Sequence, residues 1–289
     1  MADNLLSLAQ SGDRRSLAKL LTAVENDEVS HASLEIPVRQ SDGTVIGVTG
    51  APGVGKSTLI EQLLAKWTDD GLCVGVLAVD PSSPLSGGAL LGDRVRMDSA
   101  DDNDSVFVRS IATRNHPGGL PTTVGLAADV MRICGYDLVI IETVGAGQSE
   151  IRIVSVADRI LLVESPGRGD EIQAEKAGVM ELADLIVVNK SDLDGADRAA
   201  AQIISALELS DSAPLVILTS SKSGEGILEL AKQLLNLPVR AGAELARARE
   251  RLLTAWDADL LSRKDINEVL ESISKGQFTA QEWVKSKRG

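Results

Sequence analysis

The chain has 289 residues, of which 44% are hydrophobic and 2% aromatic, and it carries a formal net charge of −13. This length accommodates one large α/β domain with smaller additions, and the composition predicts a core of Val, Ile, Leu and Ala. The charge argues against broad binding to nucleic acid or anionic membranes, and because no segment resembles a signal peptide, a membrane span or a disulfide framework, we expect a cytoplasmic protein.

The first predicted elements are two short helices between Leu5 and Glu25, where Leu and Ala recur at helical spacing. Ser11-Gly12-Asp13 interrupts the pattern and separates the helices. The mixed segment 27–43 predicts a linker. Residues 1–42 are therefore expected to form an N-terminal helical extension.

Short aliphatic segments, most of them separated by helical patterns, then predict strands. They are Thr44–Thr49, Cys73–Val79, Ser105–Arg109, Leu138–Glu142, Ile160–Glu164, Leu185–Asn189 and Leu215–Thr219. Strands that alternate with helices predict an α/β fold, with a mostly parallel sheet covered by helices on both faces. Residues 43–238 would form this domain, and ligands would bind beyond the carboxyl ends of its strands.

The segment after the first strand has the G-x-x-x-x-G-K-S pattern of a phosphate-binding P-loop and opens a helix predicted at Thr58–Trp67. Its backbone amides can point at phosphate oxygens, Lys56 can reach the β- and γ-phosphates, and Ser57 can offer a hydroxyl to Mg²⁺. The predicted phosphate-binding residues are Gly50, Ala51, Pro52, Gly53, Val54, Gly55, Lys56, Ser57 and Thr58. The sequence therefore predicts a P-loop NTPase.

Acidic residues close two other strands, where Mg²⁺ and its waters would lie. These are Asp80 and Glu142, and Asp93 in a polar segment is a further candidate ligand of the metal or of its water. Gly145 could give its amide to the γ-phosphate, as in the D-x-x-G segment of many GTPases, although the acid here is Glu142. We predict that Ser57 completes the metal set, and that Lys56, Glu142 and Gly145 act in catalysis.

The segment from Asn189 to Asp192 follows a strand and has the N-K-x-D pattern that selects guanine. The Asp192 carboxylate can accept from both the N1–H and the 2-amino group of guanine, whereas adenine would present it with a lone pair. Asn189 should tie the base site to the P-loop, and the stem of Lys190 should cover the ring. Ser220-Ser221-Lys222 resembles the loop that contacts guanine O6, with a simple turn as an equal alternative.

The last part of the chain predicts an amphipathic helix from Ala241 to Leu261 and shorter helices at Asp265–Ile273 and Thr279–Lys287. Residues 239–289 would form an arm that either caps the domain or makes an oligomer interface.

Together these motifs resemble the MeaB/ArgK/MMAA GTPases over about residues 5–240, and the run from Glu142 to Glu150 is the most specific part. The resemblance implies GTP/GDP and Mg²⁺ as ligands, slow hydrolysis that a partner stimulates, and a homodimer. It further implies a chaperone of an adenosylcobalamin-dependent mutase, of the methylmalonyl-CoA mutase type, that gates cofactor loading and protection. The candidate switch or partner-facing residues are Arg94, Arg109, Arg114, His116, Gln148, Asp170, Glu171 and Lys176.

Some of these residues have plainer alternatives. Arg109, Arg114 and His116 could face phosphate or a partner, or belong to a mobile surface loop. Lys176 is a lone cation where family members carry a pair of lysines.

Two other functions could use the same P-loop. A metal-insertion GTPase usually holds its ion with a Cys/His cluster, whereas this chain has two histidines and two cysteines, without a C-x-C or C-x-x-C motif. A metabolite kinase would need an acceptor pocket, and the guanine-selecting segment at Asn189–Asp192 argues against it.

Overall fold

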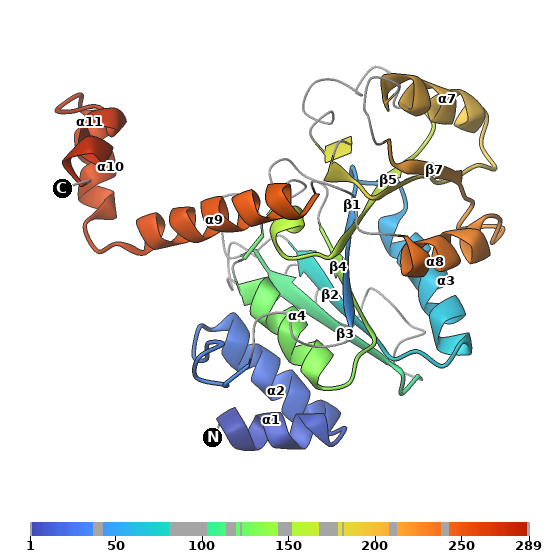
Figure 1. Ribbon diagram of the computed structural model, residues 1–289, viewed down its shortest axis with the longest axis horizontal. Helices are drawn as coiled ribbons and strands as arrows, with labels where there is room; N and C mark the ends of the chain where they lie inside the picture. Colours follow the sequence, from blue (N-terminus) through green and yellow to red (C-terminus); the bar gives the residue numbers. More distant parts are fainter. Residues whose placement is uncertain are drawn as a thin grey trace.

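A seven-stranded sheet forms the centre of the computed structural model, with its strands in the order β3-β2-β4-β1-β5-β6-β7 (Figure 1). All neighbouring strands pair in parallel, which confirms the predicted α/β class. The strands are β1 (Thr44–Thr49), β2 (Val74–Asp80), β3 (Val106–Ala112), β4 (Leu138–Glu142), β5 (Arg159–Glu164), β6 (Leu185–Val188) and β7 (Leu215–Leu218). The structure describes residues 2–36, 43–80, 103–113, 120–121, 123–143, 152–167, 179–180, 182–207, 213–237 and 243–287.

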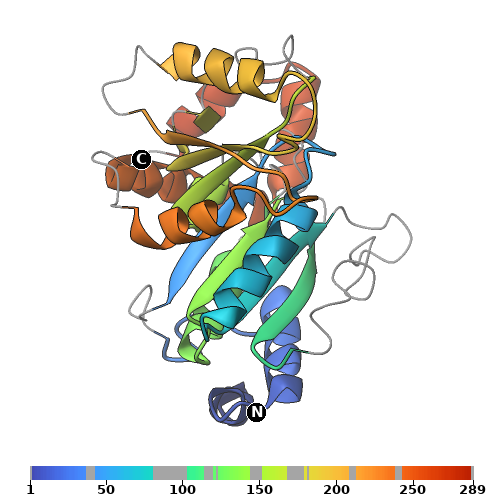
Figure 2. The ribbon, with the colours of Figure 1, turned by 90° about the vertical axis from the view of Figure 1, so that its right-hand side faces the viewer.

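Helices cover both faces of the sheet and bury two aliphatic cores (Figure 2). On one face, α3 (Lys56–Asp69) and α8 (Ile227–Asn236) pack on the central strands. On the other, α2 (Arg14–Glu25), α4 (Thr123–Ile133) and α7 (Ala196–Leu207) do so. A fully buried Leu or Ile side chain stabilises the fold by about 1.5–3 kcal/mol, which explains why aliphatic strands suffice with so few aromatic residues.

The N-terminal residues form the two predicted helices, α1 (Ala2–Gln10) and α2. Asp13 caps α2 by accepting from the amide of Arg15. The described part of the predicted linker packs on the domain, because Leu34 and Ile36 are buried in the α2–α4 core. His31 Nε2 also lies 2.9 Å from Asp129 Oδ2 on α4.

The C-terminal arm contains the three predicted helices, α9 (Ala243–Ser262), α10 (Ile266–Ser274) and α11 (Ala280–Ser286), and extends away from the sheet (Figure 1). The 3₁₀-helix η2 (Ile153–Ser155) lies against α9. Arg152 Nη2 is 2.6 Å from Asp257 Oδ2, and Arg251 Nε donates to the Ser155 carbonyl at 3.2 Å. In the described part of the chain, the helices are too short or too polar to cross a membrane.

The domain limits at residues 42 and 238 stay a prediction.

Candidate nucleotide-binding site

The P-loop connects β1 to α3 and requires glycine at two close approaches. Gly50 has a φ of +143°, and a Cβ there would lie 2.1 Å from the carbonyl oxygen of Val163 on β5. Gly55 has a φ of +96°, and a Cβ there would lie 2.5 Å from Asn189 Nδ2. Side chains at either position would push the loop away from β5 or from the base-binding segment.

Lys56 is buried, with 7% of the residue exposed, and it lies at the end of the P-loop. Its ammonium group donates to the carbonyl oxygens of Gly50 at 2.7 Å and Ala51 at 3.2 Å. Lys56 is also the first residue of α3, so its positive charge lies close to the amino end of that helix. This combination favours a bound phosphate. In the first turn of α3, Thr58 is exposed and Ser57 is partly exposed.

Ser57 and two strand-end acids provide oxygen atoms at this end of the sheet. Ser57 Oγ donates to Glu142 Oε1 at 2.5 Å, and Asp80 is fully buried. Glu142 is in register with Ala78, two residues before Asp80 on the neighbouring strand. Because alternate residues of a strand share a face and register partners point the same way, Asp80 and Glu142 lie on one face, the one that α3 covers.

Asn189 joins the base-binding segment to the P-loop. Its Nδ2 donates to the carbonyl of Val54 at 3.0 Å, and its Oδ1 accepts from the amide and the hydroxyl of Ser221 at 3.1 and 2.9 Å. Thr219 Oγ1 donates to the same oxygen at 3.3 Å. A buried side chain with all these contacts fixes three loops relative to one another.

The neighbouring base-site residues are also held. Lys190 Nζ donates to the carbonyl of Gly53 at 2.6 Å, and Lys190 has a φ of 62°, which costs a non-glycine residue about 1–3 kcal/mol. The Asp192 carboxylate is exposed and accepts from Ser220 Oγ at 2.7 Å. That bond, aided by the charges of Lys222 and Lys190, lowers the pKa of Asp192. The Ser220–Lys222 segment therefore orients both Asn189 and Asp192.

Sequence reasoning did not find two threonines that lie among these groups. Thr219 supports Asn189, and Thr143 Oγ1 donates to Thr49 Oγ1 at 3.1 Å where β1 and β4 end. Thr219, Thr143 and its partner Thr49 are all buried. The sequence carried a signal for Thr143 and Thr219, because each is a polar residue that directly follows a strand, β4 and β7 respectively.

Of the predicted switch or partner-facing residues, Arg109 is the one that the structure describes. Arg109 lies inside β3, and its side chain forms an ion pair with Glu25 and a hydrogen bond with Thr22, both on α2. The remaining predicted residues lie outside the described residues: Asp93, Arg94, Arg114, His116, Gly145, Gln148, Asp170, Glu171 and Lys176.

Comparison with known proteins agrees with this geometry. Residues 17–272 match the family described as Methylmalonyl Co-A mutase-associated GTPase MeaB. GTPase ArgK of Escherichia coli (strain K12) is 34% identical over 275 residues, which are 89% of this chain and 82% of that protein. The Mus musculus protein named Methylmalonic aciduria type A homolog, mitochondrial, is 35% identical over 285 residues, 90% of this chain and 69% of that protein. A crystal structure of an LAO/AO transport system kinase covers 99% of this chain and 95% of its own with a TM-score of 0.69, and at 24% identity it supports the fold.

Proposed function

Because this chain belongs to the family of methylmalonyl Co-A mutase-associated GTPases MeaB, and is thus a P-loop GTPase, we propose that it is a chaperone of an adenosylcobalamin-dependent mutase of the methylmalonyl-CoA type. GTP hydrolysis, slow in the protein alone and faster with the mutase, gates the loading and protection of the cofactor. The family description and the name of the mouse relative support this role.

The observation that carries the GTP part of the proposal is the network around Asn189. One side chain bonds to both the phosphate loop, at Val54, and the base loop, at Ser221. Asp192 then accepts from guanine, while Lys56 and the loop amides neutralise charge on the phosphates. Phosphoryl transfer to water depends mainly on such positioning and charge neutralisation.

We also propose that Ser57, Asp80 and Glu142 hold Mg²⁺. The donors fit this ion, because a hydroxyl and two carboxylates supply hard oxygen ligands on one face of the sheet. Among the described residues, no group of three or more His, Cys, Asp or Glu side chains could hold a metal. Mg²⁺ usually takes one or two carboxylates together with phosphate and water oxygens, and Asp80 and Glu142 supply two carboxylates here. When bound, the ion neutralises charge on the phosphates.

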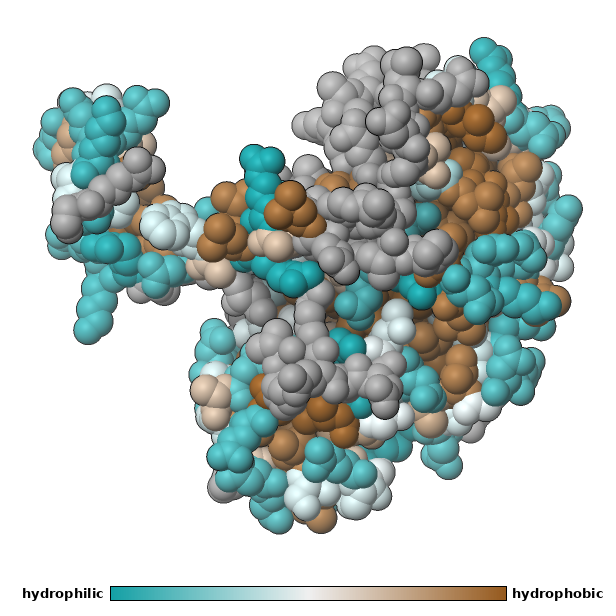
Figure 3. All heavy atoms as spheres, in the orientation of Figure 1, coloured by the Kyte–Doolittle hydropathy of each residue, from teal (hydrophilic) through white to brown (hydrophobic). Residues whose placement is uncertain are grey.

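The C-terminal arm provides the interface of the proposed homodimer. Leu245, Leu252 and Trp256 on α9 are 78%, 68% and 65% exposed. Figure 3 shows hydrophobic residues on the surface of the arm, mainly on the part of it that is next to the sheet domain. These residues lie about two turns and one turn apart, so they share one side of the helix. A second copy of the chain would cover this stripe.

The experiment that tests the function is GTP hydrolysis by the full chain with and without purified methylmalonyl-CoA mutase. ATP is measured in parallel, and Lys56→Ala serves as the blank. We expect turnover that is selective for GTP and increases when the mutase is added. If the rate of GTP hydrolysis does not change when the mutase is added, the mutase is not the client, and only the GTPase activity stands. Equal hydrolysis of ATP and GTP would contradict the role of Asp192 in selecting guanine.

A further inference from the structure

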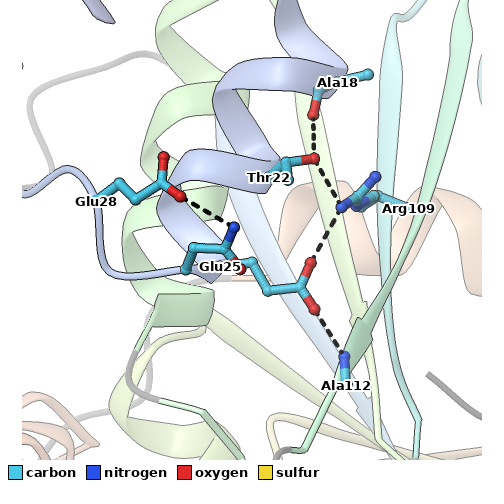
Figure 4. A network of polar contacts seen from close by, with 7 residues as sticks. Ala18, Thr22, Glu25, Glu28, Arg109 and Ala112 are labelled. Atoms are coloured by element: carbon cyan, nitrogen blue, oxygen red, sulfur yellow. Dashed lines mark hydrogen bonds and ion pairs between the residues drawn. The ribbon is translucent and has the colours of Figure 1, made fainter. Parts of the chain in front are cut away.

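Glu25, the last residue of α2, is bonded to two groups of β3 (Figure 4). Its Oε2 accepts from Arg109 Nη2 at 3.0 Å, and its Oε1 accepts from the Ala112 amide at 3.3 Å. Arg109 Nη2 also donates to Thr22 Oγ1 at 3.0 Å. The side chains of Arg109 and Glu25 are only 19% and 13% exposed. Shielding of this kind strengthens a charge-assisted contact, so α2 is held at a defined point of the strand.

This point is the carboxyl end of an edge strand. In the sheet formed by the described residues, β3 pairs with β2 on one side and stands at the edge on the other. The outward amides of an edge strand lack a ladder partner, and Glu25 supplies one for Ala112. Ala112 is the last residue of β3, so the carboxylate bonds to the strand where it ends.

The next amide along the chain points the other way. Thr113 N donates to the carbonyl oxygen of Asp80 at 2.9 Å, and Ala112 is in register with Asp80. Two successive amides therefore connect the Glu25 carboxylate to the main chain of Asp80. The buried carboxylate of Asp80 belongs to the proposed Mg²⁺ site.

We propose that Glu25 is a positioning residue for the Mg²⁺ site. By fixing the Ala112 amide it sets where β3 ends, and through Thr113 it sets the main chain that carries the Asp80 carboxylate. The inference rests on the proposed function, since it takes Asp80 as a metal residue. It gives the N-terminal helices a role in setting how tightly the GTPase binds Mg²⁺, in addition to covering the sheet.

Arg109 contributes by orienting Glu25. A glutamine at position 25 could still accept from the Ala112 amide, but its uncharged side chain would pair more weakly with the guanidinium group. Glu25→Gln should therefore weaken the effect without removing it, and Glu25→Ala should remove it. A residue that merely docks α2 would change stability in both variants and leave Mg²⁺ binding alone.

The test uses the full chain and a fluorescent GDP analogue, and it measures how much Mg²⁺ is needed to slow nucleotide release by half. We expect Glu25→Ala to raise this concentration by about tenfold and Glu25→Gln by about threefold, as for residues that orient metal ligands. Affinity for the analogue in excess EDTA should stay unchanged. Glu28→Gln is the matched control, because this acid near the same helix end is exposed and, among the hydrogen bonds of the described residues, its side chain accepts only from Asn26 Nδ2, at 3.2 Å.

The variant Asp80→Asn distinguishes a failure of the positioning role of Glu25 from a failure of the proposed Mg²⁺ site. If it shifts the Mg²⁺ curve and neither Glu25 variant does, the positioning role is wrong and the metal site stands. If Asp80→Asn leaves the curve unchanged, the metal assignment fails and the role of Glu25 fails with it. Should Glu25→Ala not fold, the curve of Glu25→Gln decides, and a curve equal to that of the unmodified protein overturns the inference.

Discussion

The Ser220 hydroxyl donates a 2.7 Å hydrogen bond to Asp192 Oδ1 and so joins the loop after β7 to the loop after β6. This bond is the main reason that the pKa of Asp192 is lowered in the folded protein. A lowered pKa means that the carboxylate stays ionised as the pH falls through the usual Asp range. What the ionised group contributes is lost only when the pH falls through the lowered value.

Ser220→Ala should therefore raise the pKa of Asp192 and move the acid loss of guanine nucleotide affinity to higher pH. Near neutral pH the variant should lose less affinity for GDP than it does at acid pH, because Asp192 remains ionised there and only the orienting bond is missing. An NMR titration of the Asp192 carboxyl carbon, with GDP affinity measured over the same acid range, checks both points. Ser223→Ala is the control in the same loop, and an unchanged Asp192 pKa in Ser220→Ala would contradict the assignment.

Gly55 tests how closely the phosphate loop and the base loop must approach. A Cβ at this position would meet Asn189 Nδ2 at 2.5 Å, so Gly55→Ala should displace Asn189 from Val54. We expect a loss of about 1–3 kcal/mol in the free energy of unfolding and weaker binding of both GTP and GDP. Chemical denaturation and nucleotide affinity measure these effects.

The control for Gly55→Ala is Gly71→Ala. Gly71 has a similar φ of +83°, and a Cβ there would meet nothing within 4 Å, so this variant carries the backbone cost without the clash. Equal destabilisation by the two substitutions would show that the contact with Asn189 is unimportant.

Much of the sheet and of the nucleotide site could be predicted because their signals are local. Aliphatic runs between helical patterns gave all seven strands near their observed bounds. The spacing of Gly50, Gly55 and Lys56, followed far along the chain by Asn189 and Asp192, placed the phosphate and base groups beyond strand ends. In such a fold the chain direction of parallel strands brings these ends together without any further information.

Contacts between distant segments could not be predicted in this way. For Arg109 the sequence suggested a phosphate, a partner or a surface loop as its surroundings, and it gave no sign of the ion pair with Glu25, which is 84 residues away in the sequence. Nothing in the local pattern indicates that α2 packs on β3. Likewise, Leu34 and Ile36 stand in a segment without helical or strand periodicity, and only tertiary packing shows that they are buried.

The thiol of Cys134 provides a test of burial away from the nucleotide site. Burial raises the pKa of this thiol to about 11. Since the thiolate is the reactive form, alkylation by iodoacetamide at about pH 8 should be at least about tenfold slower than for a free cysteine. The Cys73→Ser variant leaves Cys134 as the only cysteine, because the chain has two.

The rate in this variant should rise with pH up to about 11, the value of the raised pKa. The same variant in urea is the control, since unfolding should restore ordinary reactivity. Equal rates in the folded and unfolded protein would show that Cys134 is accessible.

Charged substitutions on α9 test whether the C-terminal arm forms the interface of the proposed homodimer. Leu252→Glu combined with Trp256→Glu would place two carboxylates in an apolar interface, where burying a charge without a partner is unfavourable. We expect the double variant to sediment as a monomer at concentrations where the unmodified chain is a dimer. Leu228→Glu is the control, because Leu228 is 52% exposed on α8, outside the arm. If the unmodified chain is monomeric at every concentration, the proposal of a homodimer is wrong. If the double variant is still a dimer, the interface lies elsewhere than on α9.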